Sequence, residues 1–341
     1  MKKSTIILLS ILIALAGFSI YIYKNKSKTS TIDKEASDFK YKDTASIDKI
    51  FLADKEGKQI LVERKAEGWL LDGKYHVRPD VIDLLLYTIR SVEVKSPVSK
   101  NGRTSVIKIM AAKSTKVELY SKGEKVKQYY VGHATQDNTG TYMILTNLEN
   151  GENYEEPFIT HIPGFDGFLS TRYITDAIDW RDRLLINYRP PQIKQIKLEL
   201  HEAPDSSFVI DLYSMQRFGL KTLKGKFIPF QEDQMKQYIA YFQNVNCEIV
   251  LDKKDRLVDS LSKSAMPFAT LTITDRNNEN CVCEFFHKQS SALKNEEYGI
   301  NYKYDPDRLF VKYNNGKDFG VAQFYVFGKI LQTYQYFLPR K

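Results

Sequence analysis

Cysteine is scarce in this chain of 341 residues, which contains only Cys247, Cys281 and Cys283. This small and odd number excludes a disulfide framework. Cys281 and Cys283 alternate in an expected strand and therefore share one face, where we interpret them as small apolar core residues. Metal binding would need further ligands, and only His287 is close in sequence. We therefore expect neither a metal nor a cofactor.

Catalytic motifs are also missing. The five histidines lie in separate segments, and the chain has no zinc-protease, paired-cysteine, nucleophile-elbow, Walker or dinucleotide-binding pattern. The segment 164–167 has two glycines but lacks the lysine and helix start of a phosphate-binding loop. The sequence therefore predicts no catalytic residues and favours a protein that is not an enzyme.

The composition is that of an ordinary globular protein, with 43% hydrophobic and 27% charged residues. Aromatic residues reach 13%, which favours sheet-rich structure. The net charge is +8, and the first 35 residues carry half of it. Because the excess is largely a terminal feature, it does not indicate nucleic-acid binding.

The amino terminus has one long uncharged stretch. Lys2 and Lys3 precede residues 5–23, which contain no charge and as a helix would span ~28 Å. This pattern predicts a membrane anchor over residues 1–24, in contact with the lipid bilayer through residues 5–23. Ala14 and Ala16 also fit a signal-peptidase site, but the apolar run continues past them, so we favour an uncleaved signal-anchor.

The expected location is the bacterial inner membrane, with a single span. The basic residues on the two sides of the span are nearly equal in number, so they do not fix its orientation. A short tail before a long folded region favours translocation, and we expect the soluble part on the periplasmic or external face. A cytosol-facing region is the alternative.

Behind the anchor we expect three parts. Residues 25–45 are rich in Lys, Ser and Thr and read as a flexible stalk. A first α+β unit over 46–188 begins with a hairpin (47–54 and 59–65), followed by a helix over 79–91 and a short helix over 104–113. A second unit over 189–341 shows the same order of elements about 150 residues later. The sequence thus predicts an α+β fold of two tandem repeated units, each a mainly antiparallel sheet with one long and one short helix.

Two polar stretches are candidates for ligand binding. In the loop over 132–142, Gln136, Asp137 and Thr139 present donors and acceptors between two strands. The alternative is a hairpin connection whose polar residues serve turn geometry. Arg181 is a candidate for binding an anion or a partner; in the alternative it pairs with a neighbouring aspartate.

Several of these segments together resemble a bacterial envelope family. They are Gly68-Trp69, Lys74-Tyr75, Arg78-Pro79-Asp80, the helix end and strand over 88–95, the segments 130–132, 135–137, 139–143 and 161–165, and Asp179-Trp180-Arg181. This pattern, over most of residues 45–190, is similar to the domain-of-unknown-function family four-three-four-zero. The resemblance implies a membrane-anchored, non-catalytic protein, in some members associated with gliding-type ABC export systems, and it supplies no catalytic residues.

These observations lead to one functional prediction and one alternative. We expect a non-catalytic binding or scaffolding module in the cell envelope, whose partner is another subunit of a membrane complex, such as an exporter to which it is accessory. The alternative is an envelope ligand-binding protein or enzyme that uses the 132–142 loop and Arg181. The sequence leaves the oligomeric state open.

Overall fold

Strands formed by alternating apolar and polar residues dominate the structure. The computed structural model describes residues 34–341 except 264, 292–295, 298 and 340–341, together with Leu15, Ala16 and Ser19. The expected α+β class with mainly antiparallel sheets is confirmed, because the described chain forms two antiparallel sheets, of nine and eight strands, accompanied by a few helices. The chain divides into two compact units, Met1–Trp180 and Arg181–Lys341.

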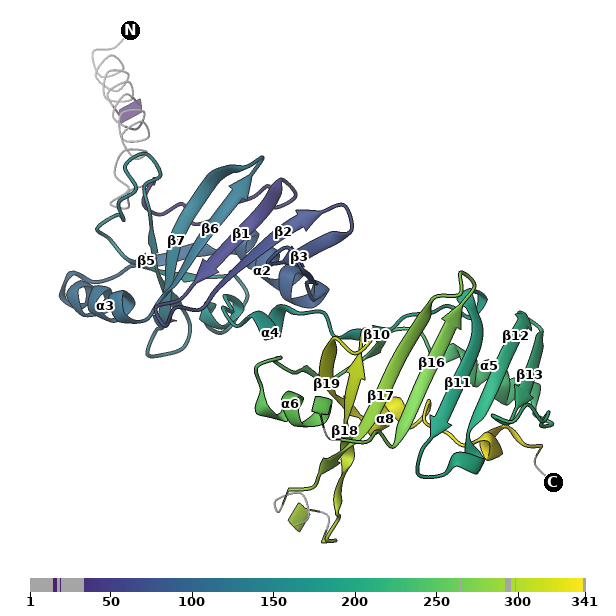
Figure 1. The fold of residues 1–341 in the computed structure, drawn as a ribbon. Helices are drawn as coiled ribbons and strands as arrows, with labels where there is room; N and C mark the ends of the chain where they lie inside the picture. The colour runs from purple at the N-terminus through teal and green to yellow at the C-terminus, as the bar shows by residue number, and fades with distance from the viewer. Residues whose placement is uncertain are drawn as a thin grey trace, which may run out of the picture. The chain divides into compact units, whose positions relative to one another are not determined.

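The first unit is built on the nine-stranded sheet, in the order β4-β3-β2-β1-β6-β7-β8-β9-β5 (Figure 1). Every neighbouring pair of its strands is antiparallel. The bounds are β1 (Ile47–Ala53), β2 (Gln59–Lys65), β3 (Gly68–Leu71), β4 (Tyr75–His76), β5 (Glu93–Pro97), β6 (Thr115–Ser121), β7 (Glu124–Ala134), β8 (Thr141–Leu145) and β9 (Phe158–His161).

Two helices pack on this sheet. Helix α2 (Pro79–Ser91) occupies the expected range, starts with a proline suited to a first helical turn, and buries one apolar stripe in the main core. Helix α3 (Lys100–Ala112) packs with Ile144 and Tyr130. Tyr130 alternates with the core residues Tyr129 and Val131 on β7, so α3 covers part of the opposite face.

The structure of the segment before β1 corrects the prediction of a flexible stalk over residues 25–45. Phe39 is 1% exposed in the main core, where its ring lies edge-on to Tyr129 and Phe158. The ammonium group of Lys127 donates to the backbone oxygens of Asp38 and Lys40 and to the Asp38 carboxylate. Residues 36–41 are therefore part of the first unit. The prediction rested on the polar composition of the stretch, which does not show that one aromatic residue, Phe39, packs in the core.

The second unit contains the eight-stranded sheet, in the order β13-β12-β11-β16-β17-β18-β19-β15. Its neighbouring strands are also antiparallel throughout. The bounds are β11 (Ile193–Leu200), β12 (Phe208–Ser214), β13 (Arg217–Lys221), β15 (Ile249–Val250), β16 (Ala269–Asp275), β17 (Asn280–Gln289), β18 (Tyr304–Tyr313) and β19 (Asp318–Gln323).

Aromatic side chains fill the core of this unit. Phe208 and Phe337 lie 5.2 Å apart between ring centroids, and both contact Tyr238 of helix α5. In the described part of this unit the sheet is accompanied by helices α5 (Glu232–Ala240), α6 (Arg256–Lys263) and the short α8 (Phe324–Phe327). Strand β10 (Leu184–Ile186) pairs with β14 (Val245–Asn246). The chain from residue 181 onward therefore belongs to the second unit. The boundary thus falls between 180 and 181, ahead of the expected 188.

The remaining short elements connect these strands and helices. They are η1 (Ser170–Arg172), α4 (Ala177–Trp180), η2 (Pro190–Gln192), η3 (Pro204–Ser206) and η4 (Tyr334–Phe337). Trp180, at the end of α4, is fully buried in the core of the first unit, and its indole nitrogen donates to the Ile174 carbonyl at 2.9 Å.

The predicted membrane anchor requires a correction. In the described part of the chain, no helix is both long and apolar enough to cross a membrane. The 13 residues of α2 or α3 extend ~20 Å, short of the ~30 Å hydrocarbon core. This finding contradicts the expected single-pass span and inner-membrane location. Residues 5–23, on which that prediction rested, lie outside the described residues apart from Leu15, Ala16 and Ser19.

Candidate functional site

A cavity of about 490 Å³ opens at one end of the first sheet. Strand β6 pairs antiparallel with both β1 and β7, so the end of β1, the start of β6 and the end of β7 meet at the same edge. The lining comes from the turn after β1 (54–56 and 58), the α3–β6 junction (112–115), the end of β7 (131–134), and Phe168, Ser170, Thr171 and Thr175. The volume lies within the ~300–1,000 Å³ range of small-molecule sites.

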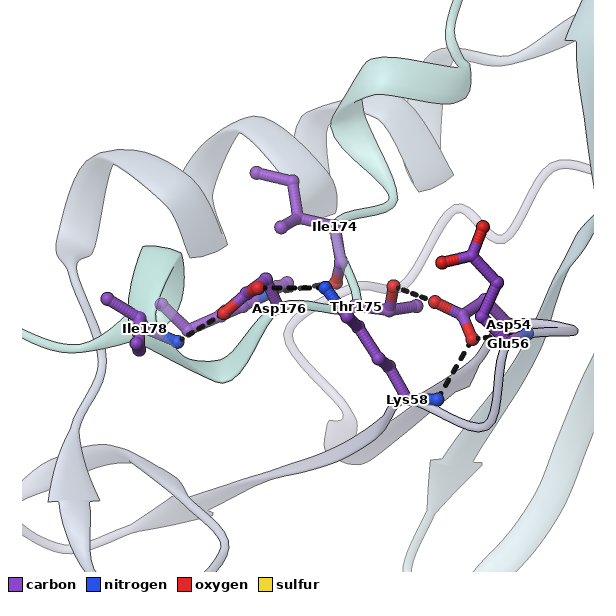
Figure 2. A network of polar contacts seen from close by, with 8 residues as sticks. Asp54, Glu56, Lys58, Ile174, Thr175, Asp176 and Ile178 are labelled. Atoms are coloured by element: carbon purple, nitrogen blue, oxygen red, sulfur yellow. Dashed lines mark hydrogen bonds and ion pairs between the residues drawn. The ribbon is translucent and has the colours of Figure 1, made fainter. Parts of the chain in front are cut away.

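One wall of the cavity is held by a polar network (Figure 2). The Asp54 carboxylate accepts hydrogen bonds from the Thr175 hydroxyl at 2.6 Å and from the backbone amides of Glu56 and Lys58, each at 2.9 Å. The Lys58 ammonium group in turn donates to Asp176 at 3.0 Å. Two contacts therefore tie the β1–β2 turn to a segment nearly 120 residues later in the chain.

The network also sets the ionisation of its carboxylates. Burial raises the pKa of Asp54, but the hydrogen bonds from Thr175 and from the two amides outweigh it, and the pKa is lowered overall. The hydrogen bond from Lys58 lowers the pKa of Asp176, helped by the amide of Ile178. Both groups are anions at neutral pH, so the wall is charged and fixed before any ligand arrives.

His133 is the one imidazole in the lining. Its ring centroid lies 4.8 Å from that of Tyr142, and its Nδ1 is buried with no hydrogen-bond partner among the described residues. Burial lowers the pKa of His133, which favours the neutral ring at neutral pH. The adjacent Gly132 has no room for a side chain, because a Cβ there would lie 2.8 Å from Cγ of Met110 on α3.

Three charged side chains of the lining lie outside the network. The Lys55 ammonium group is 5.3 Å from the ring centroid of Tyr130. Glu56 and Lys113 are exposed, and among the described residues neither has an ion-pair partner within 4.0 Å. The cavity therefore presents charges of both signs to solvent.

In the predicted ligand loop, Asp137 and Thr139 form hydrogen bonds with neighbouring residues of the protein. Asp137 accepts hydrogen bonds from the hydroxyls of Thr135 at 2.5 Å and Thr139 at 2.7 Å, and these bonds lower its pKa. The Lys95 ammonium group donates to the Thr139 hydroxyl at 2.8 Å. Gln136 is exposed. The cavity takes Gly132 and His133 from the start of this loop but none of residues 136–139, and ligand binding by those residues stays a prediction.

Arg181 lies in the second unit and is buried there. Its guanidinium donates to Asp318 at 2.9 Å, and the two side chains are 9% and 6% exposed. Asp318 also accepts a hydrogen bond from Asn314 at 2.8 Å. The sequence alternative was a neighbouring aspartate, whereas this aspartate is 137 residues away. Ligand or partner binding by Arg181 stays a prediction.

Sequence analysis did not identify the cavity network. Asp54 before a Glu-Gly pair signals a turn, but nothing near it indicates the contact with Thr175, 121 residues later. Among the described residues, no group of three or more His, Cys, Asp or Glu side chains is arranged to hold a metal ion.

Comparison with known proteins identifies no relative: no family model, curated protein or solved structure matches the chain. The resemblance to family four-three-four-zero therefore stays a prediction.

Proposed function

We propose that this protein is a non-catalytic binding module and that the cavity of the first unit is its ligand site. The observation that carries the proposal is the polar wall, in which the Asp54 carboxylate is hydrogen-bonded to Thr175 and two backbone amides, and Lys58 forms an exposed ion pair with Asp176. Because this wall is ordered without a ligand, binding loses little conformational entropy there.

The chemistry of the lining supports binding more than catalysis. A catalytic histidine is normally oriented by a hydrogen bond to one ring nitrogen while the other acts on a nucleophile. The Nδ1 of His133 has no such partner among the described residues, and the Asp54 carboxylate is already bonded to Thr175 and two amides. These groups suit recognition of a ligand.

We also propose that the two units are duplicates. In the first unit, three sheet neighbours (β1, β2, β3) and the two-residue β4 precede a helix, an edge strand and a second helix, and four further neighbouring strands follow. Strand β4 has no counterpart among the described strands of the second sheet. The second unit gives β11, β12, β13, α5, β15, α6 and β16–β19 in the same order. This correspondence supports duplication and also suggests that one unit can acquire a ligand site while the other serves another role.

A protein partner for the second unit is a further candidate, as expected for a scaffold within a larger complex. It is supported by apolar side chains around the β12–β13 hairpin: Tyr213, Met215, Leu223 and Phe227 are 42–67% exposed. Co-purification from native cells with stoichiometric recovery of a second protein, abolished by Phe227→Ser, would support this role. Recovery of the chain alone would argue against it.

The ligand site is tested by thermal unfolding of the full chain with a panel of small metabolites. A ligand at 100 times its Kd stabilises the native state by ~2.7 kcal/mol, which raises Tm. Thr171→Trp should fill the cavity mouth and abolish this rise without lowering the Tm of the free protein. Thr104→Trp, on an exposed face of α3 outside the lining, is the matched control. Ligands that stabilise Thr171→Trp equally, or a panel with no stabilising compound, would contradict the proposal.

A further inference from the structure

The charges in the cavity lining point to the class of its ligand, an inference that rests on the proposed function. Lys58 is neutralised by Asp176, and Asp54 is held by Thr175 and two amides. Lys55 and Lys113 then remain as cations and Glu56 as an anion, beside the hydrogen-bonded but still ionised Asp54. Opposite charges therefore face one volume with no ion pair between them.

The end of α3 adds a second source of negative potential. Residues 112–115, which line the cavity, include the last residue of this 13-residue helix and the start of β6. The final carbonyls of a helix carry partial negative charge equivalent to about half an electron. An ammonium group is stabilised beside them, and a ligand with only negative charge is not.

A ligand of one charge sign fits this lining poorly. A simple anion would meet Lys55 and Lys113, but also Glu56, the ionised Asp54 and the helix carbonyls. A simple cation would be repelled by the lysines. Neutral His133 favours neither sign. The half-buried Phe168 provides an apolar surface in the same cavity.

We propose that the cavity binds a zwitterion, namely a free amino acid or a short peptide with both termini free. Its carboxylate binds the ammonium groups of Lys113 and Lys55, and its ammonium group binds Glu56 and the carbonyl end of α3. The side chain of the ligand packs against Phe168. The volume of about 490 Å³ admits a ligand larger than a single small amino acid.

Isothermal titration of the full chain tests this inference. A survey of the free amino acids and of dipeptides, alanyl-leucine among them, first identifies the compound that binds most tightly, which is the parent. The parent is then compared with its C-terminal amide and its N-acetyl form. The parent should bind, and blocking either terminus should weaken binding at least tenfold. Lys113→Gln should weaken the parent but leave the amide unchanged, and Glu56→Gln should weaken the parent but leave the N-acetyl form unchanged. The controls Lys108→Gln and Glu67→Gln, exposed and outside the lining, should bind like the unaltered chain.

The possible failures separate the two proposals. Equal binding of the parent and the N-acetyl form would show a plain anion site, and equal binding of the amide would show a plain cation site; either result overturns the zwitterion inference. If no amino acid or dipeptide binds while another compound stabilises the chain through Thr171, the inference fails and the proposed function stands. If no compound binds at all, both fail.

Discussion

At the scale of single residues, the buried ion pairs are places where removal of one partner should be costly. Arg181 and Asp318 are both almost fully buried, and Lys253 approaches the same carboxylate at 3.5 Å. In the first sheet, Glu118 is 6% exposed and accepts hydrogen bonds from Tyr120 and Lys125, with Lys116 at 2.8 Å. Each carboxylate serves several cations or donors, so its loss removes more than one polar contact at once.

Asp318→Ala should destabilise the second unit by about 3–5 kcal/mol, because it leaves the Arg181 guanidinium buried without its anion. Urea unfolding at pH 7 measures the change. The control is Glu232→Gln, which breaks an exposed pair with Lys236 and should change stability by less than about 0.5 kcal/mol. A similar small effect from both substitutions would refute this reading of the Arg181–Asp318 pair.

Glu118 should make the first unit sensitive to acid. Burial raises its pKa, but the bonds from Lys116, Lys125 and Tyr120 outweigh this and lower the pKa from 4.5 to about 2. A carboxylate with a depressed folded-state pKa contributes fully above pH ~4.5, and the contribution disappears as the pH falls toward 2. Between pH 5 and pH 2 the unaltered chain should lose about 2 kcal/mol more than Glu118→Gln.

Urea titrations at several pH values give this difference. Glu124→Gln, exposed on the same unit, is the control and should follow the unaltered chain throughout. If the free energy of unfolding falls with pH in the same way for Glu118→Gln and for the unaltered chain, Glu118 is not the source of the acid sensitivity.

At the scale of elements, the segment before β1 behaves as part of the sheet domain. Phe39→Ala should destabilise the first unit by about 3–5 kcal/mol, because it empties a core site beside Tyr129 and Phe158. Tyr87→Ala, on an exposed part of α2, should change stability by no more than about 0.5 kcal/mol. Denaturant unfolding compares the two variants.

Lys127→Met tests the attachment of this segment separately from its core contact. It removes the ammonium group that bonds to Asp38 and Lys40, so the amides of residues 36–41 should exchange hydrogen faster while those of β7 stay protected. Unchanged exchange in 36–41 would mean that Phe39 alone holds the segment.

At the scale of the whole molecule, each unit has its own core. We expect two calorimetric transitions for the full chain, since each unit buries its own set of aromatic and aliphatic side chains. Phe39→Ala should lower one Tm and Phe208→Ala, in the second core, the other. A single transition that shifts with either substitution would show that the units unfold as one.

The sequence by itself determined many of the local elements, though not the strands β10, β14 and β18. Apolar alternation placed β1 and β2, and the proline with its apolar stripe placed α2 over Pro79–Ser91, because these signals depend on neighbouring residues only. It also indicated the α+β class and the order of elements in each unit. The uncharged amino-terminal stretch gave an equally local signal, from which we predicted a membrane location. That prediction is contradicted, because no helix among the described residues is long and apolar enough to cross a membrane.

Only the tertiary structure decided the contacts between distant residues. Phe39 joined the core, Arg181 paired with Asp318, and Asp54 bonded to Thr175 across more than 100 residues of chain. The residues next to a side chain in the sequence do not indicate a partner so far away, because the partner depends on the register and packing of the strands. The cavity is of the same kind. The pairing of β1, β6 and β7 brings three of its lining segments to one edge, and the bond between Asp54 and Thr175 joins the fourth, 168–175.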